Sequence, residues 1–270
     1  MPEPTQPPGK KSVSTTALVI LCGLLLLLSL AAAVIFPVVR EVRFLERMES
    51  EGFSLNDAER TTFSWGPFDR LNRSVVGIYD PNRPNALPSL HPIRNSPTLE
   101  TISLKRTAMT QDHMAELGTL ENLTWFVLNS QVTPDFATSL PRHFPNLEHF
   151  SLPLDSENIK ALSRTPLAWR QNITSIASRP SSVLEGNDIE TLVDAFPNLM
   201  NVYMIGNDLG KVDLSALASR PFEFINLEQS QPDLSQLRGC ELSFLGLRDN
   251  QYEYGGPRPL SGFEYRGTQN

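Results

Sequence analysis

The sequence predicts an α/β protein built from repeated units and preceded by one helix that crosses a membrane. Two observations support this prediction: an apolar pattern that returns eight times in the second half of the chain, and an uninterrupted apolar run near its start. In each copy of the pattern, an apolar residue is followed three and five positions later by two more. The last two point to the same side of an extended segment, so each copy predicts a short strand with one buried face.

The eight copies start 18 to 26 residues apart, and an apolar residue occupies every slot except one, which Ser178 fills. A single strand cannot bury its apolar side alone, so consecutive copies are expected to stack in chain order and pair as a parallel sheet. The copies are Leu99-Ile102-Leu104, Leu123-Phe126-Leu128, Leu147-Phe150-Leu152, Ile173-Ile176-Ser178, Leu199-Val202-Met204, Phe222-Ile225-Leu227, Leu242-Leu245-Leu247 and Leu260-Phe263-Tyr265.

The segments between the copies have helical periodicity. Met114, Leu117 and Leu120 recur every three residues. The 19-residue pattern that starts at Thr110, T-x-x-x-M-x-x-L-x-x-L-x-x-L-x-x-F-x-L, resembles bacterial leucine-rich repeats whose convex side is helical. The resemblance implies a leucine-rich-repeat solenoid over residues 96–270, with a parallel concave sheet and short convex helices. Helices or single turns are expected near 111–118, 134–140, 156–163, 187–195, 213–218 and 232–237.

The repeats are degenerate in two respects. Three positions after the last apolar slot this family usually has Asn, whose side chain bonds to backbone groups where the chain leaves the strand. Among seven copies only Asn207 and Asn250 follow this rule. In the fourth copy Ser178 occupies an apolar slot and Arg179-Pro180 follows. Either that strand is short, or its register is shifted by one or two residues.

Residues 17–39 form an uncharged apolar run of 23 residues, long enough to cross the hydrocarbon core of a membrane. A cleaved signal peptide is the alternative, because Ala31-Ala32-Ala33 has the small side chains of a cleavage site. The apolar run continues past this point as far as Val39, which favours an uncleaved transmembrane helix. Residues 1–16, rich in proline, are expected to be a disordered tail.

The charges that flank the apolar run give little information on topology. Lys10 and Lys11 precede the run and three arginines follow it, so the positive-inside rule barely discriminates. The simplest arrangement is a single-pass protein of the cell membrane, with a short cytoplasmic tail and the repeats on the extracytoplasmic side. Cys22 lies in the apolar run and Cys240 is alone, so no disulfide is expected within the repeats, which favours a bacterial source.

Residues 40–95 lie between the apolar run and the repeats. Val42, Leu45 and Met48 recur at helical spacing, which predicts a juxtamembrane helix, and residues 75–78 are typical of a strand. A stack of repeats needs an amphipathic cover over its first unit, so this region is expected to be an N-terminal cap. The order of anchor, juxtamembrane helix, Trp-containing segment and helical repeats resembles the membrane-anchored leucine-rich-repeat proteins of planctomycete-like bacteria.

No motif in the sequence indicates enzymatic chemistry. None of the four histidines stands in a metal-ligand spacing, and there is no C-x-x-C pair, phosphate-binding glycine loop, dinucleotide fingerprint or G-x-S-x-G elbow. The formal net charge of −7 disfavours nucleic acid as a partner. The protein is therefore expected not to be an enzyme, to need no cofactor or metal, and to have no small-molecule substrate.

The concave face offers candidate binding residues. The third and fifth residues of each copy point away from the core, and large aromatic side chains occupy several of these slots. Exposed aromatic residues on such a surface are typical anchors for partners, although they also pack on one another. The expected binding residues are Trp125 and His149 in one patch, and Tyr203, Phe224 and Phe244 in a second. A polar rim is expected from Lys105, Arg179, Glu228 and Arg248.

Two functions are compatible with these features. The first is a membrane-anchored extracytoplasmic protein-binding module, which uses the concave face of the solenoid to recognise a protein whose identity the sequence does not give. The second is a structural envelope protein that self-associates and has no specific ligand.

Overall fold

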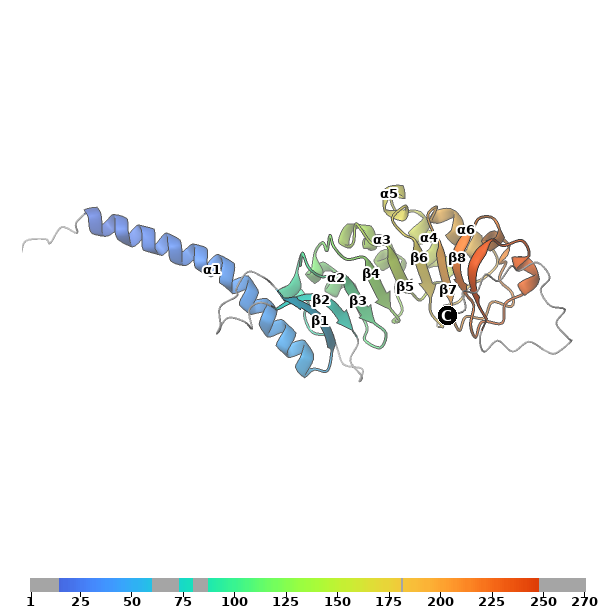
Figure 1. Ribbon diagram of the computed structural model, residues 1–270, viewed down its shortest axis with the longest axis horizontal. Helices are drawn as coiled ribbons and strands as arrows, with labels where there is room; N and C mark the ends of the chain where they lie inside the picture. Colours follow the sequence, from blue (N-terminus) through green and yellow to red (C-terminus); the bar gives the residue numbers. More distant parts are fainter. Residues whose placement is uncertain (1–14, 60–72, 80–86, 181, 248–270) are drawn as a thin grey trace, which may run out of the picture.

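A nine-stranded sheet forms the centre of the computed structural model, which describes residues 15–59, 73–79, 87–180 and 182–247. The strands follow one another in chain order from β1 to β9. The first pair is antiparallel and every later pair is parallel. The short helices lie along one side of the sheet, and a long helix projects from the β1 end (Figure 1). The predicted α/β class and the mostly parallel sheet are confirmed.

Each of the first seven copies of the apolar pattern contains one strand, β3 to β9. The strand β2 precedes them and the antiparallel β1, which the sequence did not predict, covers β2. The eighth copy, Leu260-Phe263-Tyr265, lies outside the described residues. The bounds are β1 Ser54–Glu59, β2 Arg73–Tyr79, β3 Thr101–Leu104, β4 Trp125–Leu128, β5 His149–Leu152, β6 Ser175–Ser178, β7 Asn201–Met204, β8 Phe222–Asn226 and β9 Leu242–Gly246.

Neighbouring parallel strands pair at equivalent positions of the repeat. Phe126 lies opposite Phe150. In the fourth copy, Ile176 lies opposite Phe150 on one side and Val202 on the other, so the suspected register shift is absent. Because a shift of one residue would turn every inward side chain outward, this pairing keeps all the apolar slots on one face.

Every segment expected to be helical contains a helix or a single turn. Thr110, Thr133 and Asp155 cap three of these helices by accepting a hydrogen bond from the backbone N–H three residues later. The short segments η2 and α5 were not predicted. The bounds are α1 Thr15–Ser50, η2 His91–Ile93, α2 Gln111–Leu117, α3 Pro134–His143, α4 Ser156–Ser163, α5 Leu167–Arg170, α6 Asp188–Ala195, η3 Ser215–Ala218 and η4 Leu234–Leu237.

Large aromatic side chains fill the space between the sheet and the helices. Phe126, Phe144, Phe150 and Phe196 are fully buried. The ring centres of Phe126 and Phe144 lie 5.0 Å apart, and those of Phe150 and Phe196 lie 5.7 Å apart. The indole N–H of Trp169 donates a 2.9 Å hydrogen bond to the carbonyl of Phe144, which fixes α5 against the preceding copy.

A small polar network explains the serine in the apolar slot of the fourth copy. The buried Ser178 hydroxyl lies 2.7 Å from Ser182 Oγ and 3.3 Å from Asn207 Oδ1. The backbone N–H of Asn207 donates in turn to Ser230 Oγ at 3.3 Å. Three consecutive copies therefore share hydrogen-bonded polar groups in place of apolar contact, and these bonds offset the cost of burying the hydroxyl.

Two rows of hydrogen bonds at the entry to the strands join each copy to the next. The carbonyl of Glu100 accepts the N–H groups of both Thr124 and Trp125, at 3.0 and 3.1 Å. The carbonyls of residues 124, 148, 174 and 200 each accept two N–H groups in the same way. Asparagine side chains form the second row, at 2.5 to 3.1 Å, with Asn122 donating to Pro97, Asn146 to Glu121, Asn172 to Pro145 and Asn198 to Gln171.

The helix α1 is a single uninterrupted element of 36 residues, rather than a transmembrane helix followed by a separate juxtamembrane one. Its leucine-rich first part is exposed, and α1 is the one helix of the described chain that is long and apolar enough to cross a membrane. Its last turns bury Phe44, Leu45 and Met48 against β1, β2 and η2. This packing continues the helix past Val39 because its apolar side chains find a core there.

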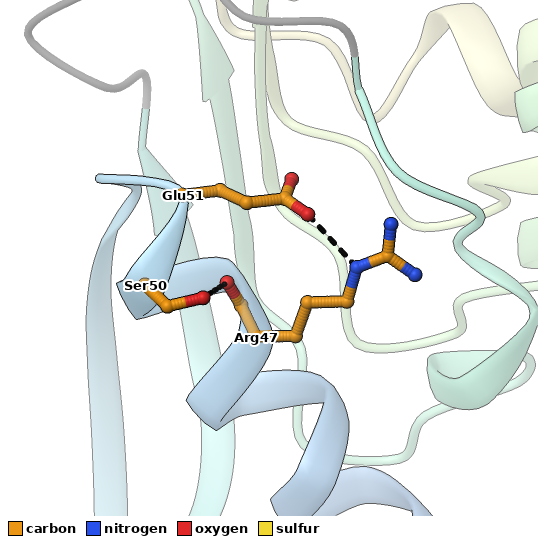
Figure 2. A network of polar contacts seen from close by, with 3 residues as sticks. All are labelled: Arg47, Ser50 and Glu51. Carbon is orange, nitrogen blue, oxygen red and sulfur yellow. Dashed lines mark hydrogen bonds and ion pairs between the residues drawn. The ribbon is translucent and has the colours of Figure 1, made fainter.

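Polar contacts and a glycine end α1. The hydroxyl of Ser50 donates a 2.7 Å hydrogen bond to the carbonyl of Arg47, and Arg47 Nε lies 2.8 Å from a carboxylate oxygen of Glu51 (Figure 2). Gly52 then adopts a φ of 90°, a conformation that costs glycine little, and the chain turns into β1.

The side chains in the inward slots differ in how much they contribute to the free energy of unfolding, because they differ in burial. Phe126 is fully buried, whereas Leu245, which was also expected to be buried, is half-buried on β9, the last described strand. Phe126→Ala should destabilise the protein by about 3–5 kcal/mol, because it removes a large ring and leaves a cavity. Leu245→Ala should cost clearly less. Thermal melting of the detergent-solubilised chain, followed by circular dichroism, checks both; equal losses would contradict the assigned burial.

Candidate functional site

A row of aromatic rings crosses the face of the sheet opposite the helices. All five predicted binding residues belong to it. The rings of Trp125 and His149 are stacked 3.5 Å apart and nearly parallel, at 11°. Tyr203 stacks on Phe224 at 5.0 Å, and Phe224 on Phe244 at 4.3 Å. We call these five residues the aromatic row.

The aromatic row is continuous, whereas the sequence predicted two patches. His149 and Tyr203 belong to β5 and β7, yet their ring centres lie 6.4 Å apart in an edge-on arrangement. The intervening strand β6 presents only Ser175 and Ala177 on this face, and these small side chains leave room for the two rings to meet. The single row therefore depends on residues that are themselves not aromatic.

The five residues differ in how far they are open to a partner. Trp125 and Phe244, at the two ends of the row, are 45% and 38% exposed. Tyr203 and Phe224 are half-buried. His149 is only 6% exposed, because Trp125 stacks on one side of it and Tyr203 lies on the other. Little of the His149 side chain is therefore open to a partner, and its stacking contact supports the ring of Trp125.

A hollow of about 480 Å³ opens beside the Trp125 end of the row. Tyr79 of β2, Trp125 and Tyr203 contribute aromatic walls, while Lys105 and Arg179 contribute positive charge. These two basic residues are members of the expected polar rim; Glu228, a third, is half-buried, and Arg248 lies outside the described residues. The sequence did not predict the hollow, because its shape depends on how side chains from several neighbouring strands fit together.

His149 and Ser175 are the pair on this face that most resembles catalytic machinery. His149 Nδ1 lies 2.7 Å from Ser175 Oγ, and both residues are buried. Burial, and after it the positive charge of Arg179, lowers the pKa of His149 from 6.5 to about 4. A histidine with so low a pKa is a weak general base near neutral pH. The pair is therefore better explained as a support for Trp125 than as a nucleophile and base.

Comparison with known proteins gives no family assignment. No protein-family model, curated protein or solved structure matches the chain. Function is therefore inferred from the geometry of the aromatic row and of the hollow.

The pKa of His149 predicts a component of acid sensitivity. Between pH 6.5 and about 4 the unfolded chain binds a proton that the folded state excludes, so this residue's contribution to stability is complete above pH 6.5 and falls as pH is lowered toward 4. His149→Gln should reduce the fall in stability between about pH 7 and about pH 4.5 by about 2 kcal/mol. Melting curves of both proteins over this range test the prediction, and identical pH dependence would contradict it.

Proposed function

We propose that this chain is a membrane-anchored leucine-rich-repeat protein that binds a protein partner, outside the cytoplasm, on the concave face of its sheet. The observation that carries the proposal is the continuous aromatic row, a surface feature that the core does not require. Aromatic residues are enriched at the centres of protein interfaces, where they account for much of the binding energy.

The order and spacing of the strands support the leucine-rich-repeat class. Seven copies of one pattern form seven consecutive parallel strands with matched register. Short helices connect them on one side, and rows of hydrogen bonds link successive copies. A solenoid is the architecture in which such units stack one on the next and each contacts mainly its neighbours. The proposal extends it over residues 96–270, with the eighth copy included.

The dimensions of the aromatic row favour a protein over a small molecule. The row runs from β4 to β9, which is five strand spacings or roughly 24 Å. A small molecule would cover only part of that length, and a drug-sized ligand also needs an enclosing pocket. Phe224 lies between two stacked rings, so mainly its edge is open to a partner. Several apolar and polar side chains of a partner protein can contact such an extended row of ring edges at once.

The length and composition of α1 support anchoring at the cell membrane. It contains the uncharged apolar run of 23 residues at 17–39, and none of the leucines from Leu18 to Leu30 is buried against the rest of the protein. Exposed apolar residues in such a run are unfavourable in water and favourable in lipid. We place the repeats on the extracytoplasmic side, with residues 1–16 in the cytoplasm.

The anchor can be tested separately from binding. We expect the full-length protein to stay in the membrane fraction after an alkaline carbonate wash and to keep its residues before Val34. A reporter enzyme that is active only outside the cytoplasm, fused after Asn270, should be active. Release into the soluble fraction, or a mature N-terminus at Val34, would instead make the protein a secreted one; an inactive reporter would reverse the topology.

Binding can be tested by photo-crosslinking in the native envelope. With Tyr203 replaced by the photoreactive amino acid benzoylphenylalanine, we expect a discrete crosslinked species containing a second protein, identified by mass spectrometry. Trp125→Ala or Phe224→Ala in the same chain should remove most of that crosslink, because each removes a large ring of the aromatic row. Leu167→Ala is the matched control: it truncates an exposed apolar side chain, 53% exposed, on α5 of the opposite side.

The outcomes of the crosslinking experiment separate the two functions. A foreign protein that depends on Trp125 and Phe224 supports the binding module. A crosslink to a second copy of the chain, together with concentration-dependent oligomers in light scattering, would favour the self-associating structural protein. Full retention of the foreign crosslink in both alanine variants would exclude the concave face as the binding surface.

A further inference from the structure

Arg179 is the residue whose environment is least explained by the fold. It follows β6 directly, lines the hollow, and is half-buried. Its Nε atom is buried without a hydrogen-bond partner, and its guanidinium pairs with no other described residue. Burial lowers the pKa of this side chain, which shows that its charge loses hydration in this position. A partly desolvated cation without a partner is unfavourable, and a bound anion would remove that cost.

The groups around Arg179 also favour a negative charge. Lys105 lines the same hollow, and His149 is neutral near pH 7 because its pKa is about 4. None of the described residues that line the hollow has a carboxylate, although the chain as a whole has a net charge of −7. The edges of the surrounding aromatic rings carry partial positive charge. The hollow is therefore an electropositive site on an acidic protein.

The size and shape of the hollow suit an extended acidic peptide. Lys105 and Arg179 follow strands that are three positions apart in the sheet, so their backbones lie roughly 14 Å apart. That distance corresponds to about four residues of extended chain. The planar guanidinium of Arg179 can bind a carboxylate through two parallel hydrogen bonds.

We propose that the hollow is a subsite for an acidic side chain of the protein partner, with Arg179 binding the carboxylate and Lys105 attracting a second negative charge. The inference rests on the proposed concave-face function, and it adds the chemical class of the segment that is recognised: an extended peptide with a carboxylate beside an apolar residue, the apolar residue lying against Trp125.

A peptide selection tests this inference without knowledge of the partner. The full-length protein, solubilised in a neutral detergent, is used to select from a random nonapeptide library displayed on phage. We expect the enriched peptides to be rich in Asp and Glu next to an apolar residue. Enrichment of neutral or basic peptides, or no enrichment at all, would overturn the proposal.

Substitutions of Arg179 and Lys105 test which of the two residues binds the selected peptides. Arg179→Gln should weaken the selected peptides at least tenfold, and Lys105→Gln by a smaller factor, because exposed charges are more strongly screened. Arg179→Lys should retain part of the affinity, since it keeps the charge but loses the planar pair of donors. Arg142→Gln on α3 is the matched control, because it removes one exposed positive charge from the opposite side. Equal affinity for the Arg179→Gln and Arg142→Gln proteins would overturn the assignment.

A second measurement reads the charge of the hollow directly. Iodide, an anion, should quench the fluorescence of Trp125, taken as the difference between the wild-type and Trp125→Phe proteins. Arg179→Gln should reduce this quenching while quenching by neutral acrylamide stays the same, which also shows that Trp125 keeps its position. Unchanged iodide quenching in Arg179→Gln would contradict an electropositive hollow.

Failure of this inference and failure of the proposed function give different results. If peptides bind through Trp125 and Phe224 but ignore Arg179, the binding face stands and the acidic subsite falls. If the affinity of acidic peptides depends on Arg179 but not on Phe224, the acidic subsite is supported and the extended aromatic interface is contradicted. If polygalacturonate binds in an Arg179-dependent way while no acidic peptide is enriched, the site recognises an anionic glycan and the peptide proposal is wrong.

Discussion

Equivalent residues of neighbouring parallel strands pair one to one from β3 to β9, and this register keeps the apolar side chains together between the sheet and the helices. At the entry to each strand from β4 to β8, one carbonyl of the preceding copy accepts two N–H groups, and an asparagine amide beside it bonds to the same preceding copy in four cases. These contacts fix the position of each strand relative to the preceding one. Apolar slots therefore remain on the core side over seven copies whose spacing varies.

The same constraint builds the opposite face. Parallel strands lie about 4.8 Å apart, which is close to the distance at which aromatic rings stack. The strand spacing alone therefore brings rings at equivalent positions of neighbouring copies into contact, as for Trp125 with His149 and Phe224 with Phe244. Where β6 carries Ser175 in the equivalent slot, the row continues because the neighbouring rings tilt across the small side chain. The strand pairing that packs the apolar core therefore also arranges the aromatic rings on the opposite face.

Period and alternation were sufficient to predict β3 to β9 and the helices between them except α5, because each depends on a pattern within its own copy. The strand β1 has the sequence Ser-Leu-Asn-Asp-Ala-Glu, which lacks an apolar alternation, and it forms because β2 and α1 lie beside it. Alternation also predicted which residues share the face of the sheet opposite the helices. It did not predict burial of His149, the hollow or the unpaired Arg179, because these depend on side-chain volumes across several strands.

The continuity of α1 has a mechanical consequence. No loop separates its exposed apolar part from the turns that carry Phe44, Leu45 and Met48 into the core beside β1, but Pro37 lies between them and has no backbone N–H to donate to the helix. For the proposed membrane anchor, the sheet would be joined to the bilayer through this helix without an intervening loop, and Pro37 is the position at which the helix would bend. The helix and its bend at Pro37 would then set the distance and tilt of the sheet relative to the lipid surface, and a ligand of the face with the aromatic row would be bound close to the bilayer.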